Sequence, residues 1–210
     1  MTTRSDEKNF VEDLREWLSR ELEPDLRELG LDIVAHHPVL SDLTCDLDSG
    51  GRARPTLSFL EQDLVIGRWA AAPPEIQPFF RRVRDREWLL LPRIVIEVKY
   101  AGVVSHSVMT YSDIAARLKS VHGDLRFYFL MRAGSKSPEI LGRHGRTFDR
   151  IYQLVRVRGA KSPHWPPRFR PGDLAQHLED DVVASGLQRL LADIRSDLAA
   201  PRVWTSEPLA

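Results

Sequence analysis

The sequence predicts an α/β fold in which a single mixed β-sheet is flanked by helices. Apolar residues recur at helical spacing in three segments, and short runs rich in Val, Ile and aromatic residues lie between them. The order is a helix, three strands, a helix, a strand, one further short element and a last helix. The composition, 42% hydrophobic and 29% charged, is typical of globular proteins.

Three stretches have the spacing of helices. The first covers residues 6 to about 29, and Gly30 follows as a stop signal. Pro24 indicates a break or the start of a second helix at that point. The second helix is expected over 106–121, and the last covers roughly 173–198, after a proline-rich link.

The remaining apolar runs predict strands, at 31–40, 57–69, 93–100 and 124–132. The run 124–132 is apolar on both faces, which indicates an interior strand. Residues 148–158 form either a fifth strand or a short helix. Residues 41–54, which contain Asp, Ser and a Gly pair, predict a turn or a mobile loop, and 71–87 predict a long polar connection.

No segment of the chain marks a domain boundary. We therefore expect one domain over 1–210, with a core at roughly 8–132 and a basic, helical C-terminal extension at 133–210. No apolar run is long enough to span a membrane, and the N-terminus lacks the apolar core of a signal peptide. The single cysteine, Cys45, fits a reducing compartment, so we expect a cytoplasmic protein without a membrane partner.

The stretch RIVIEVKY, residues 93–100, places two charged residues in an apolar strand. Glu97 and Lys99 are two positions apart and therefore point to the same face. The preceding strand carries Asp63, which can meet Glu97 if the two strands pair antiparallel. Two carboxylates about 4 Å apart repel by about 4 kcal/mol at an effective dielectric near 20, so their burial calls for a cation.

Carboxylate oxygens are the ligands that Mg²⁺ prefers, and it needs only one or two of them beside water and phosphate. Such a metal polarises a phosphoryl oxygen and activates water, while a neighbouring lysine orients or deprotonates that water. The pattern therefore suits phosphodiester hydrolysis. The alternative interpretation is an ordinary ion pair on one face of a strand, with Asp63 only starting its own strand.

Asp63 in EQDLVI, with Glu97 and Lys99 in IEVK, resembles the PD-(D/E)xK nuclease superfamily over roughly residues 8–132. The resemblance implies the restriction-endonuclease-like fold, with Asp63 and Glu97 as Mg²⁺ ligands and Lys99 as the catalytic lysine. Gln62 stands where the family motif often has proline, which removes part of the signature.

The resemblance also implies an acid from the N-terminal helix, for which Glu12 and Glu16 are equal candidates. Glu61 shares a face with Asp63 and is a further candidate acid, although a surface role suits it better. His36, at a strand end, can approach a phosphate, but exposure to solvent is the favoured interpretation. An arginine-rich stretch interleaved with aromatic residues predicts either DNA contacts or the exposed face of an amphipathic helix: Arg81, Arg82, Arg84 and Arg86.

These observations together predict a Mg²⁺-dependent endonuclease of the type II restriction kind, which cuts double-stranded DNA at specific sequences. A homodimer is expected, because one active site cuts one strand and a two-fold pair presents two. The formal net charge is zero, so the chain as a whole is not basic and local positive patches have to supply the DNA contacts. The alternatives are a structure-specific repair or junction-resolving nuclease, and a catalytically silent nucleic-acid-binding module.

Overall fold

The computed structural model describes residues 4–71, 88–100, 105–134, 141, 143, 145–156 and 169–200. Its elements, in chain order, are α1 (Arg4–Glu21), α2 (Glu23–Leu29), β1 (Asp32–Leu47), β2 (Ala53–Ala71), β3 (Trp88–Lys99), α4 (Ser105–Val121), β4 (Arg126–Gly134), β5 (Arg150–Arg156), α6 (Asp173–His177) and α7 (Asp181–Ala199). None of the helices in these ranges is long and apolar enough to cross a membrane.

The five strands form one sheet in the order β1-β2-β3-β4-β5. β1 pairs with β2, and β2 with β3, in antiparallel fashion, whereas β3 pairs with β4, and β4 with β5, in parallel fashion. The predicted single mixed sheet flanked by helices is therefore confirmed. The run predicted as an interior strand is β4, which lies between β3 and β5, and the ambiguous segment at 148–158 contains β5.

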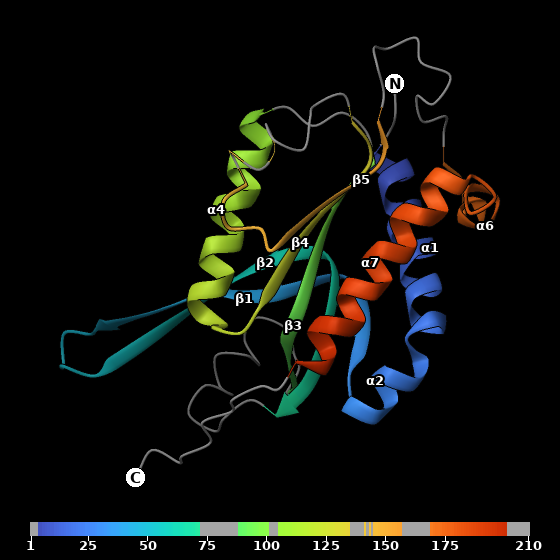
Figure 1. Ribbon diagram of the computed structural model, residues 1–210. Coiled ribbons are helices and arrows are strands. Elements are labelled where there is room, and N and C mark those ends of the chain that lie inside the picture. The colour runs from blue at the N-terminus through green and yellow to red at the C-terminus, as the bar shows by residue number, and fades with distance from the viewer. Residues whose placement is uncertain are drawn as a thin grey trace.

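Figure 1 shows α4 on one face of the sheet, and α1 and α7 on the other. The larger core buries Leu14 of α1 and Ile194 of α7 with Ile96 of β3. The smaller core buries Leu118 of α4 with Val95 of β3. Because successive strand residues point to opposite faces, the odd-numbered residues at the end of β3 face α4. Glu97 and Lys99 are odd-numbered and therefore lie on the face that α4 covers.

The helix ends follow local sequence signals. Pro24 occupies the first turn of α2, which confirms the predicted break, and Gly30 ends that helix in the left-handed conformation with φ of 62°. The prediction of one last helix over roughly 173–198 is wrong in one respect, because the structure has two helices there, α6 and α7. The side chain of Asp180 accepts hydrogen bonds from the backbone N–H groups of Val182 and Val183, and so starts α7 as a separate helix.

The prediction of a loop over 41–54 is wrong over most of its length. β1 continues to Leu47 and β2 begins at Ala53, so only a short turn joins the two strands. The carboxylate of Asp48 accepts hydrogen bonds from the N–H groups of Gly50 and Arg52, both at 2.9 Å, and closes the turn. Asp and Ser favour loops in isolation, but pairing along the whole ribbon overrides that preference. Of the expected connection at 71–87, all but Ala71 lies outside the described residues.

Gly67 is a glycine that the packing of the sheet requires. It lies at an irregularity of the β2–β3 ladder, and a Cβ atom there would come within 2.5 Å of the Leu91 carbonyl oxygen. The neighbouring atoms are backbone, which cannot turn aside as a side chain would. The close approach of β2 to β3 therefore depends on the missing side chain at this position.

We expect Gly67→Ala to destabilise the fold by about 1–3 kcal/mol, as overpacking of a filled core does. Gly123→Ala is the matched control, because a Cβ atom there meets open space. Chemical denaturation of both variants measures the difference, and equal stabilities would contradict the close packing of β2 on β3.

Candidate active site

Asp63 and Glu97 lie where the ladder between β2 and β3 ends. The strands pair antiparallel, which is the condition under which Asp63 and Glu97 can meet, and Leu64 opposite Ile96 is the last pair at this end. Beyond it the Asp63 carboxylate takes the place of a backbone partner, and its Oδ2 accepts the Val98 N–H at 2.8 Å. The two acids are thus held where the two strands separate.

Lys99 lies on the same face as Glu97, and its ammonium stands among three carboxylates. The Nζ atom is 2.9 Å from Glu97 Oε1 and 3.7 Å from Asp63 Oδ2. It also donates a hydrogen bond to Glu7 Oε1 at 3.2 Å, and it lies 4.7 Å from the centre of the Tyr111 ring. The spacing of Glu97 and Lys99 predicted the first of these contacts, whereas the other partners come from separate elements.

Glu7 is the acid that the N-terminal helix brings to this cluster. Its second carboxylate oxygen, Oε2, accepts the Tyr100 N–H at 3.2 Å, so Glu7 bridges the backbone and the side chain at the end of β3. The candidates expected on this helix, Glu12 and Glu16, are instead exposed and pair with Arg15. Glu7 lies in the first turn of α1, and only the docking of that helix reveals its role.

The cluster opens into a polar cavity of about 330 Å³. Glu61 is exposed at this cavity, and Asp63, Glu97 and Lys99 also line it. The remaining lining residues come from α1, β1, β2 and α4: Glu7, Lys8, His36, Leu60, Gln62, Tyr111 and Ile114. The four arginines Arg81, Arg82, Arg84 and Arg86 lie outside the described residues.

His36 adopts a strained conformation beside this cavity. Its φ of 48° falls in the left-handed region, where residues other than glycine are uncommon. The side chain is half-buried rather than fully exposed as expected, and its Nε2 atom is buried without a hydrogen-bond partner among the described residues. Strained residues of this kind gather at functional sites. His36 also lines the cavity, although its Nε2 atom is shielded from it.

The carboxylates differ from ordinary surface acids in their protonation. Burial, and then the charge of Asp63, raise the pKa of Glu97 to about 8. Burial also raises the pKa of Asp63, against the opposing effects of Lys99 and the Val98 N–H. Burial alone lowers the pKa of Lys99, but the charges of Glu97, Asp63 and Glu7 outweigh it and raise that pKa above its usual value. The lysine therefore stays protonated, while Glu97 and Asp63 hold more protons than they would in water.

Asp63 and Glu97 fit a Mg²⁺ site in the type and number of their ligands, since this ion needs only one or two carboxylates. Within the ranges that the structure describes, no group of three or more His, Cys, Asp or Glu side chains is arranged to hold a metal ion. Lys99 Nζ lies 2.9 Å from Glu97 Oε1 and 3.7 Å from Asp63 Oδ2. A metal bound to these oxygens would have to compete with the ammonium for them.

The comparisons with known proteins find similarity to solved structures but not to known sequences. No protein-family model and no curated protein matches the sequence. A chain of the solved structure described as "native BbvCI A2B2 tetramer at low resolution" aligns with a TM-score of 0.47 and 15% sequence identity. The alignment covers 73% of this chain and 57% of that chain, so the protein spans less than two thirds of it. A likeness of this degree says nothing about activity, which has to follow from the side chains of the site.

The raised pKa of Glu97 predicts how stability depends on pH. Its folded-state pKa is about 8, against an ordinary value of 4.5, so its contribution to stability is complete below about pH 4.5 and disappears as the pH rises to 8. Without metal, the unfolding free energy of the wild type should therefore fall relative to that of Glu97→Gln, by up to about 1.4 kcal/mol per pH unit. Urea denaturation at several pH values measures this difference.

Glu12→Gln is the matched control, because it removes an exposed acid from α1. Its stability should run parallel to that of the wild type across the same pH range. A Glu97→Gln curve that also runs parallel to the wild type would show that Glu97 is ionised at all of these pH values, and would contradict the proposed protonation.

Proposed function

We propose that the protein is a Mg²⁺-dependent endodeoxyribonuclease that hydrolyses phosphodiester bonds of double-stranded DNA. The observation that carries this proposal is the meeting of Asp63, Glu97 and Lys99 beside one polar cavity, from two strands that separate at that point. The pattern of these residues is similar to that of the PD-(D/E)xK nucleases, which supports DNA as the substrate and sequence-specific restriction as the activity. We further propose a single domain and a cytoplasmic location.

Asp63 and Glu97 would hold the Mg²⁺ ion through their carboxylate oxygens. The bound ion supplies Lewis-acid chemistry, polarising a phosphoryl oxygen and lowering the pKa of water. For Asp63 the position is fixed in advance, because the Val98 N–H holds one of its oxygens. Glu97 has to lose its proton when the ion binds, so binding should release protons to solvent near neutral pH.

Lys99 would orient the attacking water and stabilise negative charge on the phosphate. Its contact with Glu7 keeps the ammonium beside the acids, so that it is in place when the scissile phosphate arrives. The high pKa of Lys99 in the metal-free protein favours a donor over a base in that state. His36 lines the same cavity and would lie near a phosphate that enters it.

Cleavage of plasmid DNA in Mg²⁺ tests this proposal, with Asp63→Asn as the decisive variant. Asparagine keeps an oxygen for the Val98 N–H and so preserves the fold, but it lacks the charge that holds a metal. We expect the wild type to cut and Asp63→Asn to give no detectable cleavage, while the control Glu12→Gln cuts like the wild type. Discrete fragments indicate a site-specific enzyme, and a smear indicates a nonspecific one.

A wild type that binds DNA but does not cut it in Mg²⁺ or Mn²⁺ would refute the proposed activity and favour a silent binding module. Equal cleavage by wild type and Asp63→Asn would refute the site instead. In that case the activity would arise from another part of the chain or from a contaminating nuclease.

The variant Lys99→Arg tests whether the positive charge at this position is sufficient for cleavage, or whether a compact ammonium is required. Arginine preserves the positive charge, but its planar guanidinium spreads the charge and cannot take the place of a compact ammonium among three acids. We expect the variant to bind DNA normally in Ca²⁺, because one phosphate-sized contact contributes little to total affinity. In Mg²⁺ it should cut at least about a hundred-fold more slowly, the scale of a lost hydrogen-bond donor to the charge that develops in the transition state. Cleavage near the wild-type rate would contradict the catalytic role of Lys99.

A further inference from the structure

Tyr111 of α4 presents the face of its ring to the ammonium of Lys99. The Nζ atom lies over the ring, 4.7 Å from its centre, which is within the range of a cation–π contact. The Lys99 side chain is only 16% exposed, and such contacts are stronger where water is excluded. Tyr111 also lines the polar cavity together with Asp63 and Glu97. The ring is thus a neutral partner of a lysine whose other partners in the cluster are carboxylates.

The packing of the sheet fixes the position of this ring. The rings of Tyr111 and Phe129 are in contact, with their centres 5.7 Å apart. Phe129 is fully buried, and it lies opposite Glu97 in the parallel ladder between β3 and β4. Phe129 in turn stacks on Phe148, with ring centres 5.0 Å apart. The ring of Tyr111 is therefore supported by the strand next to the one that carries Glu97 and Lys99.

A carboxylate and an aromatic ring hold an ammonium in different ways. A carboxylate cancels the positive charge and accepts one of the three N–H donors of a lysine. The face of a ring attracts a cation through its quadrupole but carries no net charge. A lysine held by a ring therefore keeps both its charge and its donors for an incoming anion such as a phosphate.

This difference becomes important when a metal binds. A metal on the carboxylates of Asp63 and Glu97 would compete with the ammonium for oxygens that lie 3.7 and 2.9 Å from Nζ. Two of the partners described above then remain, Glu7 and Tyr111. They belong to α1 and α4, which lie on opposite faces of the sheet (Figure 1). The ammonium would therefore be held between two helices rather than released to solvent.

We propose that Tyr111 is a positioning residue for Lys99, whose ring keeps the ammonium in the cavity when a metal takes the carboxylates of Asp63 and Glu97. The inference rests on the proposed function for the metal and for the phosphate that the ammonium meets. The contact between the ring and the ammonium is measured without DNA and without cleavage. The inference and the proposed function can therefore fail separately.

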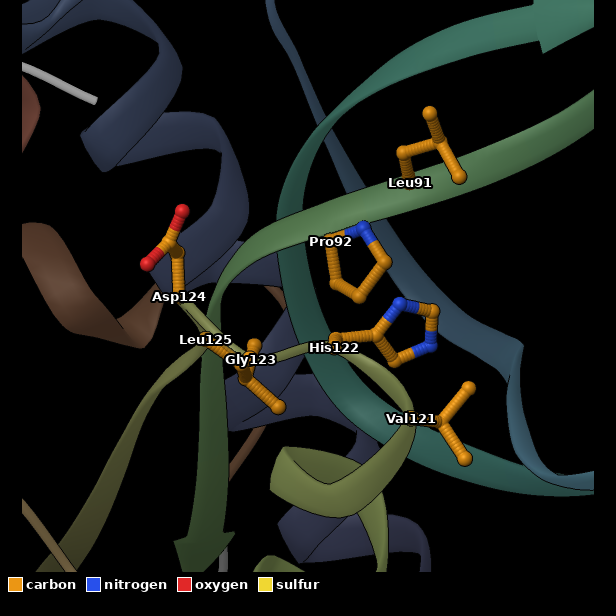
Figure 2. Close-up of a pocket in the computed structure, with 7 residues that line it drawn as sticks. All are labelled: Leu91, Pro92, Val121, His122, Gly123, Asp124 and Leu125. Atoms are coloured by element: carbon orange, nitrogen blue, oxygen red, sulfur yellow. The ribbon is translucent and has the colours of Figure 1, made fainter. Parts of the chain in front are cut away.

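A second cavity supplies a matched control on the same helix. It has a volume of about 250 Å³ and lies between the start of β3 and the turn after α4 (Figure 2). Val121, the last residue of α4, lines it together with Pro92 and His122. Among the residues that the structure describes, the two cavities share no lining residue. Val121→Ala therefore perturbs α4 without reaching Lys99.

NMR of the Lys99 ε-methylene protons tests the contact, and the variant Lys99→Arg identifies their signal. Protons over the face of an aromatic ring resonate upfield of those of a solvated lysine. We expect the upfield shift in the wild type, in Tyr111→Phe and in Val121→Ala, and its loss in Tyr111→Leu, which has no ring. The shift should persist in saturating Mg²⁺, while the amide signal of Val98 moves because its partner Asp63 binds the ion.

Single-turnover cleavage of DNA in saturating Mg²⁺ gives a second readout. Tyr111→Leu should cut at least about ten-fold more slowly than the wild type, the scale of a cation–π contact from which water is excluded. Its affinity for DNA in Ca²⁺ should be unchanged. Tyr111→Phe should recover most of the rate, because it keeps the ring. Equal losses in Tyr111→Phe and Tyr111→Leu would assign the role to the hydroxyl group and overturn the inference.

Three further results would overturn the inference even if the protein cuts DNA: a Lys99 signal without an upfield shift in the wild type, the same shift in Tyr111→Leu, or cleavage by Tyr111→Leu at the wild-type rate. A wild-type shift that vanishes when Mg²⁺ moves the Val98 signal would do so as well. A Val98 signal that Mg²⁺ leaves in place would refute the metal site, and with it both proposals. A wild type that keeps the shift in Mg²⁺ but does not cut would refute the activity alone.

Discussion

Three carboxylates, from Glu7, Asp63 and Glu97, share the ammonium of Lys99 at the end of β3. Carboxylates this close to one another repel, and burial without a cation favours their protonated forms. The lysine resolves this conflict in the metal-free protein. A metal that binds as proposed would have to displace this ammonium from the carboxylates.

The fold creates this arrangement by ending a strand ladder early. β2 and β3 stay paired through the core as far as Leu64 and Ile96, and then separate. The Asp63 carboxylate accepts a hydrogen bond from the backbone N–H of Val98. This N–H group therefore keeps a partner where β2 leaves β3, and the acid is held in place. α4 covers this face with Tyr111 and Ile114, while the first turn of α1 reaches the end of β3 with Glu7. Separate layers of the fold therefore converge on one cavity.

The sequence predicted the features that depend on local periodicity. Alternation along β3 placed Glu97 and Lys99 together, and the apolar runs placed Asp63 on the neighbouring strand. Glu7 could not be predicted, because nothing in its local sequence distinguishes it from Glu12 or Glu16 and only the docking angle of α1 brings it to the site. The outer part of the β1–β2 hairpin was predicted to be a loop for a related reason. Its loop-forming Asp and Ser residues masked an alternation of Leu43, Cys45 and Leu47 that only strand pairing makes evident.

We propose that Asp63 and Glu97 form a metal site, with the ammonium of Lys99 beside them when no metal is bound. Crystals soaked with Mn²⁺ and measured at its absorption edge test this proposal, because the anomalous signal locates the metal without reference to activity. We expect a peak in contact with the carboxylate oxygens of Asp63 and Glu97, with Lys99 Nζ moved away from Glu97. The proposal is contradicted if no peak appears there and Lys99 still bridges Glu97 and Glu7.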